Sequence, residues 1–146
     1  MSPHDRHVSP GGYVEFQDID LSIYSDDGTL HAQSDLYKWN RLLAQACNQL
    51  GVEHSPGPKL KSWMEKAGFV NIVEQVYKLP WGPWPKDKKL KEIGAWNLRQ
   101  ALDGLEGFTL QPLCEVLGWS KGEVAVLLAQ VRKDLKSPNI HGYYSL

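Results

Sequence analysis

The sequence has very few cysteines and no long hydrophobic run, and each shortage excludes a class of protein. Two cysteines, Cys47 and Cys114, occur among 146 residues, and their spacing fits neither a disulfide framework nor a zinc site. Both are expected to be buried thiols. No apolar run approaches the roughly 18 residues of a membrane span, and the amino terminus lacks the features of a secretory signal. We therefore expect an intracellular protein, cytoplasmic or nuclear, with no membrane partner.

The sequence also has little net charge. With 16 Lys and Arg against 17 Asp and Glu, the formal charge is −1, so no overall field attracts a nucleic acid. The densest basic run, from Lys86 to Lys91, lacks interleaved aromatic or arginine residues and is expected to be the solvated face of a helix. Among the five histidines, only His4 and His7 are close in sequence. We expect no metal site and no nucleic-acid partner.

The composition indicates one globular domain. Hydrophobic residues make up 42% of the chain and charged residues 23%, which argues against disorder and against a coiled coil. Residues 1–8 are polar and rich in Pro, Ser and His, and they are expected to form a flexible leader. Residues 9–146 are expected to form the domain.

The first predicted strand follows the turn residues Pro10–Gly12. It covers Tyr13–Phe16 and continues to Asp20. Three polar residues, Glu15, Gln17 and Asp18, gather toward its carboxyl end. In open α/β sheets that end faces the ligand crevice.

Helices and strands alternate along the rest of the chain. Apolar spacing, capping residues and Gly or Pro terminators predict helices over 35–50, 58–67, 87–104, 109–117 and 120–135, and strands over 69–79 and 140–146. Ser120 and Glu123 have the spacing of a capping box. Trp39, Trp63 and Trp96 lie on apolar helical stripes and are expected in the core. Alternation of this kind predicts an α/β fold, with about three strands packed with four to five helices.

Four segments in order carry a family resemblance. They are Pro10–Asp18 (PGGYVEFQD), Trp63–Phe69 (WMEKAGF), Leu79–Pro85 (LPWGPWP) and Lys88–Gly94 (KKLKEIG). Together they resemble the fungal, LaeA-like branch of the class I S-adenosylmethionine-dependent methyltransferases, and the first is similar to the segment at the fifth strand of that sheet. The resemblance implies a partial Rossmann-like fold built from the last strands of the sheet. It covers roughly residues 9–145 and implies a role linked to fungal secondary metabolism.

The donor-binding motifs of that family are not found in this sequence. No Gly-x-Gly-x-x-Gly and no Walker-type motif occurs. By resemblance, the donor S-adenosylmethionine is held mainly by the first half of the domain, so no cofactor-binding residue is assigned and the chain alone is expected not to bind it. The acceptor, a small molecule or a protein, is expected near Glu15, Gln17, Asp18, Trp81 and Trp84. No catalytic base is assigned.

The competing interpretations remain open at this point. Glu15 or Asp18 could instead cap a turn, and Trp81 and Trp84 could be packing residues. An incomplete sheet would leave the edge at Tyr13–Phe16 unpaired, so the N-terminal leader, a second copy of the chain or a protein partner is expected to cover it. The functional alternatives to a methyltransferase are a noncatalytic interaction module and a truncated gene product.

Overall fold

The fold is that of a computed structural model, which describes residues 8–146. The predicted leader, residues 1–8, lies outside the described residues apart from Val8. Its flexibility therefore stays a prediction, as does the boundary at residue 9.

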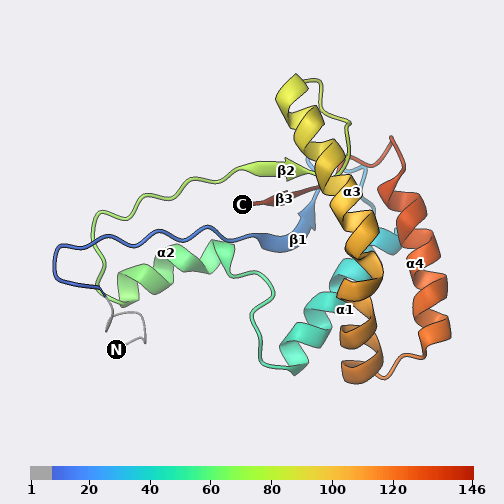
Figure 1. Ribbon diagram of the computed structural model, residues 1–146, viewed down its shortest axis with the longest axis horizontal. Helices are drawn as coiled ribbons and strands as arrows, with labels where there is room; N and C mark the ends of the chain where they lie inside the picture. Colours follow the sequence, from blue (N-terminus) through green and yellow to red (C-terminus); the bar gives the residue numbers. More distant parts are fainter. Residues whose placement is uncertain (1–7) are drawn as a thin grey trace.

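A body of packed helices contains the core. It is formed by α1 (Asp35–Gln49), α3 (Lys88–Leu110), the π-helical turn η2 (Gln111–Val116) and α4 (Lys121–Leu135). Figure 1 shows α1, α3 and α4 side by side; α4 packs against both α1 and α3, and η2 packs against α1 and α3. The buried side chains between them are Leu36, Trp39, Leu105, Leu113, Val124, Leu127, Leu128, Val131 and Leu135.

Local capping explains where these helices begin. Ser120 and Glu123 form the predicted capping box at the start of α4, each side chain bonding the other's backbone amide. Ser34 accepts a hydrogen bond from the Tyr37 amide, and Asp87 accepts one from the Leu90 amide at 2.9 Å. The predicted amphipathic helices are thus confirmed at these positions. Lys86 to Lys91 are exposed at the start of α3, as expected for a solvated face.

Two predictions about the body were wrong in detail. The helix predicted over 109–117 is not separate, because α3 runs into η2 without a break, and Pro112 lies within that π-helical turn. Cys47 and Cys114 are free thiols that are only partly buried, and Cys114 packs against the side of the core.

The sheet has three short antiparallel strands. They are β1 (Asp20–Tyr24), β2 (Lys78–Pro80) and β3 (Tyr143–Ser145), and their order is β1-β3-β2. Because β1 and β2 are each antiparallel to β3, they run parallel to each other. The predicted α/β class with three strands is confirmed.

The predicted strand boundaries differ from the structure. Residues 13–19 and 69–77 were expected within strands, yet β1 begins only at Asp20 and β2 only at Lys78. The physical reason is the length of the central strand: β3 ends at Ser145, so a ladder partner exists only for the last part of each predicted strand. Residues 13–19 and 72–77 nonetheless lead directly into β1 and β2, whereas Asn71 has a φ of 57° and turns the chain.

An arm projects from the body beyond the sheet. It consists of residues 13–19, helix α2 (Gly57–Lys66) and residues 67–77, and Figure 1 shows these three parts together on one side of the sheet. None of the residues of α2 is buried. Trp63, on α2, is 42% exposed and Trp96, on α3, is 69% exposed, so their expected core positions were wrong. Trp39 is 4% exposed and lies in the core as predicted.

Candidate functional site

The structure divides the five predicted site residues between opposite ends of the sheet. Glu15, Gln17 and Asp18 precede β1, whereas Trp81 and Trp84 follow β2. Since β1 and β2 run parallel, the first group lies at the amino ends of these strands and the second at their carboxyl ends. The argument from the carboxyl end of the first strand therefore applies to the residues after Tyr24 and not to Glu15, Gln17 and Asp18.

The first group lines a groove in the arm. The groove has a volume of about 920 Å³, and its walls are residues 14–18, residues 72–77, the first part of α2 and the end of β3. Glu15, Gln17 and Asp18 are exposed and mainly satisfy one another: Gln17 Nε2 donates to Glu15 Oε1 at 2.7 Å, and Asp18 Oδ1 accepts from the next amide. The groove at this end of the sheet is therefore lined on one side by the carboxylates of Glu15 and Asp18.

A buried carboxylate closes the inner end of that groove. Asp20 is 3% exposed, and it accepts hydrogen bonds from the Tyr24 hydroxyl at 2.5 Å, from the Ser22 amide at 2.9 Å and from the Ser55 hydroxyl. Burial alone would raise the pKa of Asp20, but these donors outweigh it and the pKa is lowered. Asp20 is thus held ionised as a structural acceptor and is a weak base.

Trp81 and Trp84 have different environments in the loop after β2. Trp81 is 4% exposed and packs in the core, with its ring 4.5 Å from that of Tyr144 in a T-shaped contact and 6.1 Å from that of Trp39. Trp84 is half-buried, and its Nε1 donates to the carbonyl of Gly142 at 3.2 Å. Trp81 therefore anchors the loop, and Trp84 is the member of the pair that reaches the surface.

Trp84 stacks on a histidine that is paired with an aspartate. Its ring lies 5.0 Å from the His141 imidazole at an interplanar angle of 26°. The His141 Nδ1 is 2.5 Å from Asp27 Oδ2, and 34% of the His141 side chain is exposed. Thr29 fixes the other side of the aspartate, donating its amide and its hydroxyl to Asp27 Oδ1 at 3.1 and 2.7 Å. Hydrogen bonds from Thr29, and then from His141, lower the pKa of Asp27.

A second aspartate extends this cluster across the sheet. Asp26 Oδ1 accepts the Tyr143 hydroxyl at 2.7 Å, and its other oxygen pairs with Lys78. The Lys78 ammonium also lies over the Tyr143 ring, 4.6 Å from its centroid. The hydrogen bond from Lys78, followed by that from Tyr143, lowers the pKa of Asp26, and the same bonds raise the pKa of each donor. An ion pair thus links the segment after β1 to Lys78, the first residue of β2.

This cluster has the chemistry of a proton acceptor. A carboxylate on Nδ1 holds an imidazole in the tautomer whose Nε2 is free to accept a proton. The stacked Trp84 fixes the plane of the ring and offers an aromatic surface beside it. Sequence analysis selected Trp84 but missed His141 and Asp27, because no local spacing joins two residues 114 positions apart.

Within residues 8–146, no group of three or more His, Cys, Asp or Glu side chains is arranged to hold a metal ion. The helices described there are all too short or too polar to cross a bilayer.

Comparison with known proteins identifies relatives along almost the whole chain. No profile of a known protein family matches the sequence, and no solved structure is significantly similar. The probable methyltransferase tdiE of Emericella nidulans is 37% identical over 94% of this chain, and methyltransferase pytC of Aspergillus terreus is 38% identical over 94%. The secondary metabolism regulator LAE1 of Cochliobolus heterostrophus is 34% identical over 96%.

The match is confined to one part of each relative. The chain spans 43% of tdiE, 43% of pytC and 46% of LAE1, and it aligns with the C-terminal part of such proteins. The chain is therefore a homologue of the C-terminal part of the fungal methyltransferases and LaeA-type secondary metabolism regulators, and it belongs to that family.

Proposed function

We propose that this chain is the acceptor-side part of an S-adenosylmethionine-dependent methyltransferase of fungal secondary metabolism, and that it transfers no methyl group alone. The observation that carries the proposal is the 37% and 38% identity to two methyltransferases along 94% of the chain. The sequence contains no Gly-rich donor loop, and the matched region is the C-terminal part of the relatives. The donor-binding half is therefore supplied by another polypeptide segment.

His141 is the proton acceptor in this proposal. S-adenosylmethionine supplies an electrophilic methyl group bonded to a sulfonium sulfur. Within this chain, His141 Nε2 would accept the proton of the acceptor's hydroxyl or amine. Asp27, already bonded to Nδ1, stabilises the imidazolium that forms. The acceptor is a small molecule or a protein side chain.

Trp84 is the proposed contact for the acceptor, since it is stacked on the His141 ring. Trp81 holds the same loop from the core side. Glu15, Gln17 and Asp18 line the groove at the other end of the sheet, so their role toward an acceptor is a separate proposal. Alanine variants at Trp84 and at Gln17, made in a form that also contains the donor-binding half, distinguish the two ends. Truncation is expected to raise the KM for the acceptor only at the end that binds it.

Isothermal titration tests the claim about the donor. The 146-residue chain titrated with S-adenosylmethionine is expected to release no binding heat at micromolar concentration. A chimera that joins the chain to the preceding N-terminal part of tdiE is expected to bind at micromolar concentration. Micromolar binding by the chain alone would falsify the proposal that the donor half lies elsewhere.

A noncatalytic interaction module is the second candidate, and one observation favours it. The arm exposes apolar side chains that a finished domain normally covers: Tyr13 is 99% exposed, Val73 82% and Val70 81%. In that case the arm docks on a protein partner or a second copy, and the chimera with tdiE binds no donor. If the chimera transfers methyl groups and loses this activity when His141 is replaced, the methyltransferase proposal is supported over the interaction module.

A further inference from the structure

The groove in the arm has apolar walls that are open to solvent. Leu60 and Met64 of α2 line it, together with Val73 and Val76 of the segment before β2. The two valines are 82% and 64% exposed. The volume of about 920 Å³ is in the range of ligand-binding clefts. Aliphatic side chains gathered along an open cleft of this size indicate a surface that a ligand covers.

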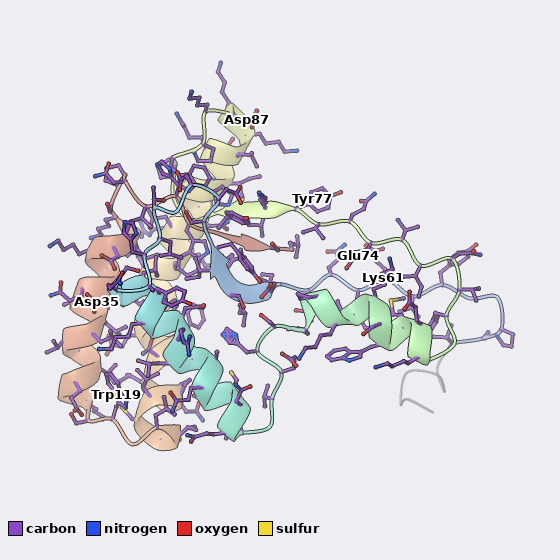
Figure 2. All side chains as sticks on the ribbon, turned by 180° about the vertical axis from the view of Figure 1, so that it is seen from behind. Asp35, Lys61, Glu74, Tyr77, Asp87 and Trp119 are labelled. Carbon is purple, nitrogen blue, oxygen red and sulfur yellow. The ribbon has the colours of Figure 1, made fainter. Side chains whose placement is uncertain are left out.

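The charged residues that line the same groove are mainly acidic. Four carboxylates, those of Glu15, Asp18, Asp20 and Glu74, line it, against the single ammonium group of Lys61. Figure 2 shows Lys61 on α2 and Glu74 on the neighbouring segment, both on the arm and away from the helical body. The whole chain has a formal charge of only −1, so the excess of negative charge is local to the groove. Such a cleft attracts cationic ligands.

These carboxylates have no cationic partner within the described residues. The ion pairs found there are Lys59–Glu53, Lys78–Asp26, Arg99–Asp103 and His141–Asp27, none of which involves a carboxylate of the groove. Glu15 and Asp18 instead accept hydrogen bonds from the Gln17 side chain and from a backbone amide. The negative charge of the groove is therefore available to a cation from outside the chain.

The groove has the length of a short peptide. Residues 14–18 line one part of it and residues 72–77 another, and Figure 1 shows both segments running lengthwise along the arm. An extended peptide of six residues spans about 20 Å, and its successive side chains point to opposite sides. One set of side chains can therefore contact the aliphatic wall while the other set reaches the carboxylates.

We propose that this groove binds a short basic segment of a partner protein, in extended form, in which Lys or Arg alternates with aliphatic residues. The aliphatic side chains cover Val73 and Val76, and the cationic groups pair with Glu15, Asp18 and Glu74. Binding here needs no methyl donor, and the groove lies at the end of the sheet away from His141. The proposal thus goes beyond the proposed methyl transfer, and its failure would leave that function untouched.

A protein segment fits the groove better than two other cationic occupants. A small organic cation would pair with carboxylates but leave the valines uncovered. A second copy of the chain offers its basic run from Lys86 to Lys91, which is exposed at the start of α3. Leu90 is the only aliphatic residue of that run, so it supplies charge with little apolar surface.

Fluorescence anisotropy with labelled peptides tests the proposal on the full 146-residue chain. The probe is Lys-Val-Lys-Val-Lys-Val. One control, Glu-Val-Glu-Val-Glu-Val, keeps the apolar residues and reverses the charge, and a second, Lys-Ser-Lys-Ser-Lys-Ser, keeps the charge and removes the apolar residues. We expect saturable binding of the probe at micromolar concentration, and binding at least about tenfold weaker for each control peptide.

A triple variant of the chain removes the exposed carboxylates of the groove. It carries Glu15→Gln, Asp18→Asn and Glu74→Gln, and the loss of three ion pairs should weaken binding of the probe at least about fivefold. Asp20 is left in place because its hydrogen bonds hold the start of β1. Far-ultraviolet circular dichroism shows whether the variant keeps its fold.

The matched control variant removes the same charge from the helical body. It carries Glu92→Gln, Glu106→Gln and Glu115→Gln, at exposed positions of α3 and η2. This variant has the same net charge as the groove variant, and it should bind the probe as the native chain does. Binding that is lost only in the groove variant, and that weakens as salt is added, supports the proposal.

Four results would overturn the proposal. Equal binding of the probe by both triple variants means that the groove carboxylates do not select it. Equal binding of the Lys-Ser peptide means that charge alone is recognised, as a small cation would be. Equal binding of the Glu-Val peptide means that the cationic groups contribute nothing. Self-association of the chain that disappears in the groove variant means that a second copy occupies the groove.

Discussion

The His141 Nδ1 atom lies 2.5 Å from a carboxylate oxygen of Asp27, although the residues are 114 positions apart. Asp27 follows β1, and His141 precedes β3, so pairing of these two strands brings them together. The Thr29 hydroxyl supports the same junction, because it accepts the His141 amide at 2.9 Å and donates to Asp27. The dyad is therefore a product of the sheet and not of local sequence.

Replacing Asp27 is expected to change the tautomer of His141. In the native chain the carboxylate accepts the Nδ1 proton, which leaves Nε2 as the acceptor. In Asp27→Asn the amide offers no charge to fix that state, so both tautomers become populated. Nitrogen-15 chemical shifts of the imidazole measure the ratio. Asp26→Asn serves as the matched control, and an unchanged spectrum in Asp27→Asn would show that the pair does not set the tautomer.

Gly94 is expected to tolerate no side chain. A Cβ there would lie 2.0 Å from the carbonyl oxygen of Gly82, which is backbone of the loop carrying Trp81 and Trp84. Gly94→Ala should lower the free energy of unfolding by about 1–3 kcal/mol or more, through overpacking. It should also weaken the stacking of Trp84 on His141. Chemical denaturation and near-ultraviolet circular dichroism report the two effects.

The control for that change lies in the same helix. A Cβ at Gly107 of α3 meets no atom within 4 Å, so Gly107→Ala should gain up to about 1 kcal/mol from helix propensity. If both variants lower the free energy of unfolding equally, the close contact between Gly94 and Gly82 is not the cause of the destabilisation.

Thr109 is expected to stabilise the core through one hydrogen bond. The Trp39 indole donates to its hydroxyl at 2.8 Å, and that hydroxyl donates to the Leu105 carbonyl at 2.6 Å. Thr109→Val keeps the shape but leaves the buried indole N–H without its acceptor, at a cost of about 1–3 kcal/mol. Thr109→Ser keeps the hydroxyl and should lose less. If urea denaturation shows that Thr109→Ser is less stable than Thr109→Val, packing of the threonine methyl group contributes more than the hydrogen bond.

The stability of the protein should fall on acidification because of His54. This side chain is 7% exposed, its Nδ1 has no partner among the described residues, and burial lowers its pKa below the usual 6.5. The unfolded chain therefore binds a proton near pH 6.5 that the folded chain takes up only at lower pH. Stability is full above 6.5 and declines as the pH falls toward the folded pKa.

His54→Phe removes that proton uptake and should flatten the curve in this window. Urea midpoints measured from pH 7.5 down to about 5 give the comparison, since ordinary carboxylates titrate below that range. Parallel curves for the two proteins would assign the acid sensitivity to another group.

Local signals in the sequence predicted the helices better than the strands. The capping box at Ser120 and the apolar spacing of α1 depend on neighbours within a few residues, and both were found in the structure. The extent of β1 depends on β3, which lies more than 100 residues further along the chain. Residues Tyr13–Phe16 have the composition of a strand, but composition does not show whether a pairing partner lies beside them, and β1 begins only at Asp20.

The candidate site was predictable only in part for the same reason. Trp84 was recognisable because three prolines and two tryptophans make a conspicuous loop. Nothing in the sequence distinguishes His141 from the other four histidines, since its partner is set by the sheet. Trp63 and Trp96 lie on apolar helical stripes, which is why they were predicted in the core. In the described residues nothing covers these stripes, so both side chains are exposed.

The position of β3 has a consequence for biosynthesis. β3 follows every other described helix and strand in the sequence, so β1 and β2 have no common partner until residues 143–145 have been synthesised. Helices α1, α3 and α4 depend on earlier residues and can pack first. Assembly of the sheet, and with it the pairing of Asp27 and His141, is therefore expected to follow the packing of these helices.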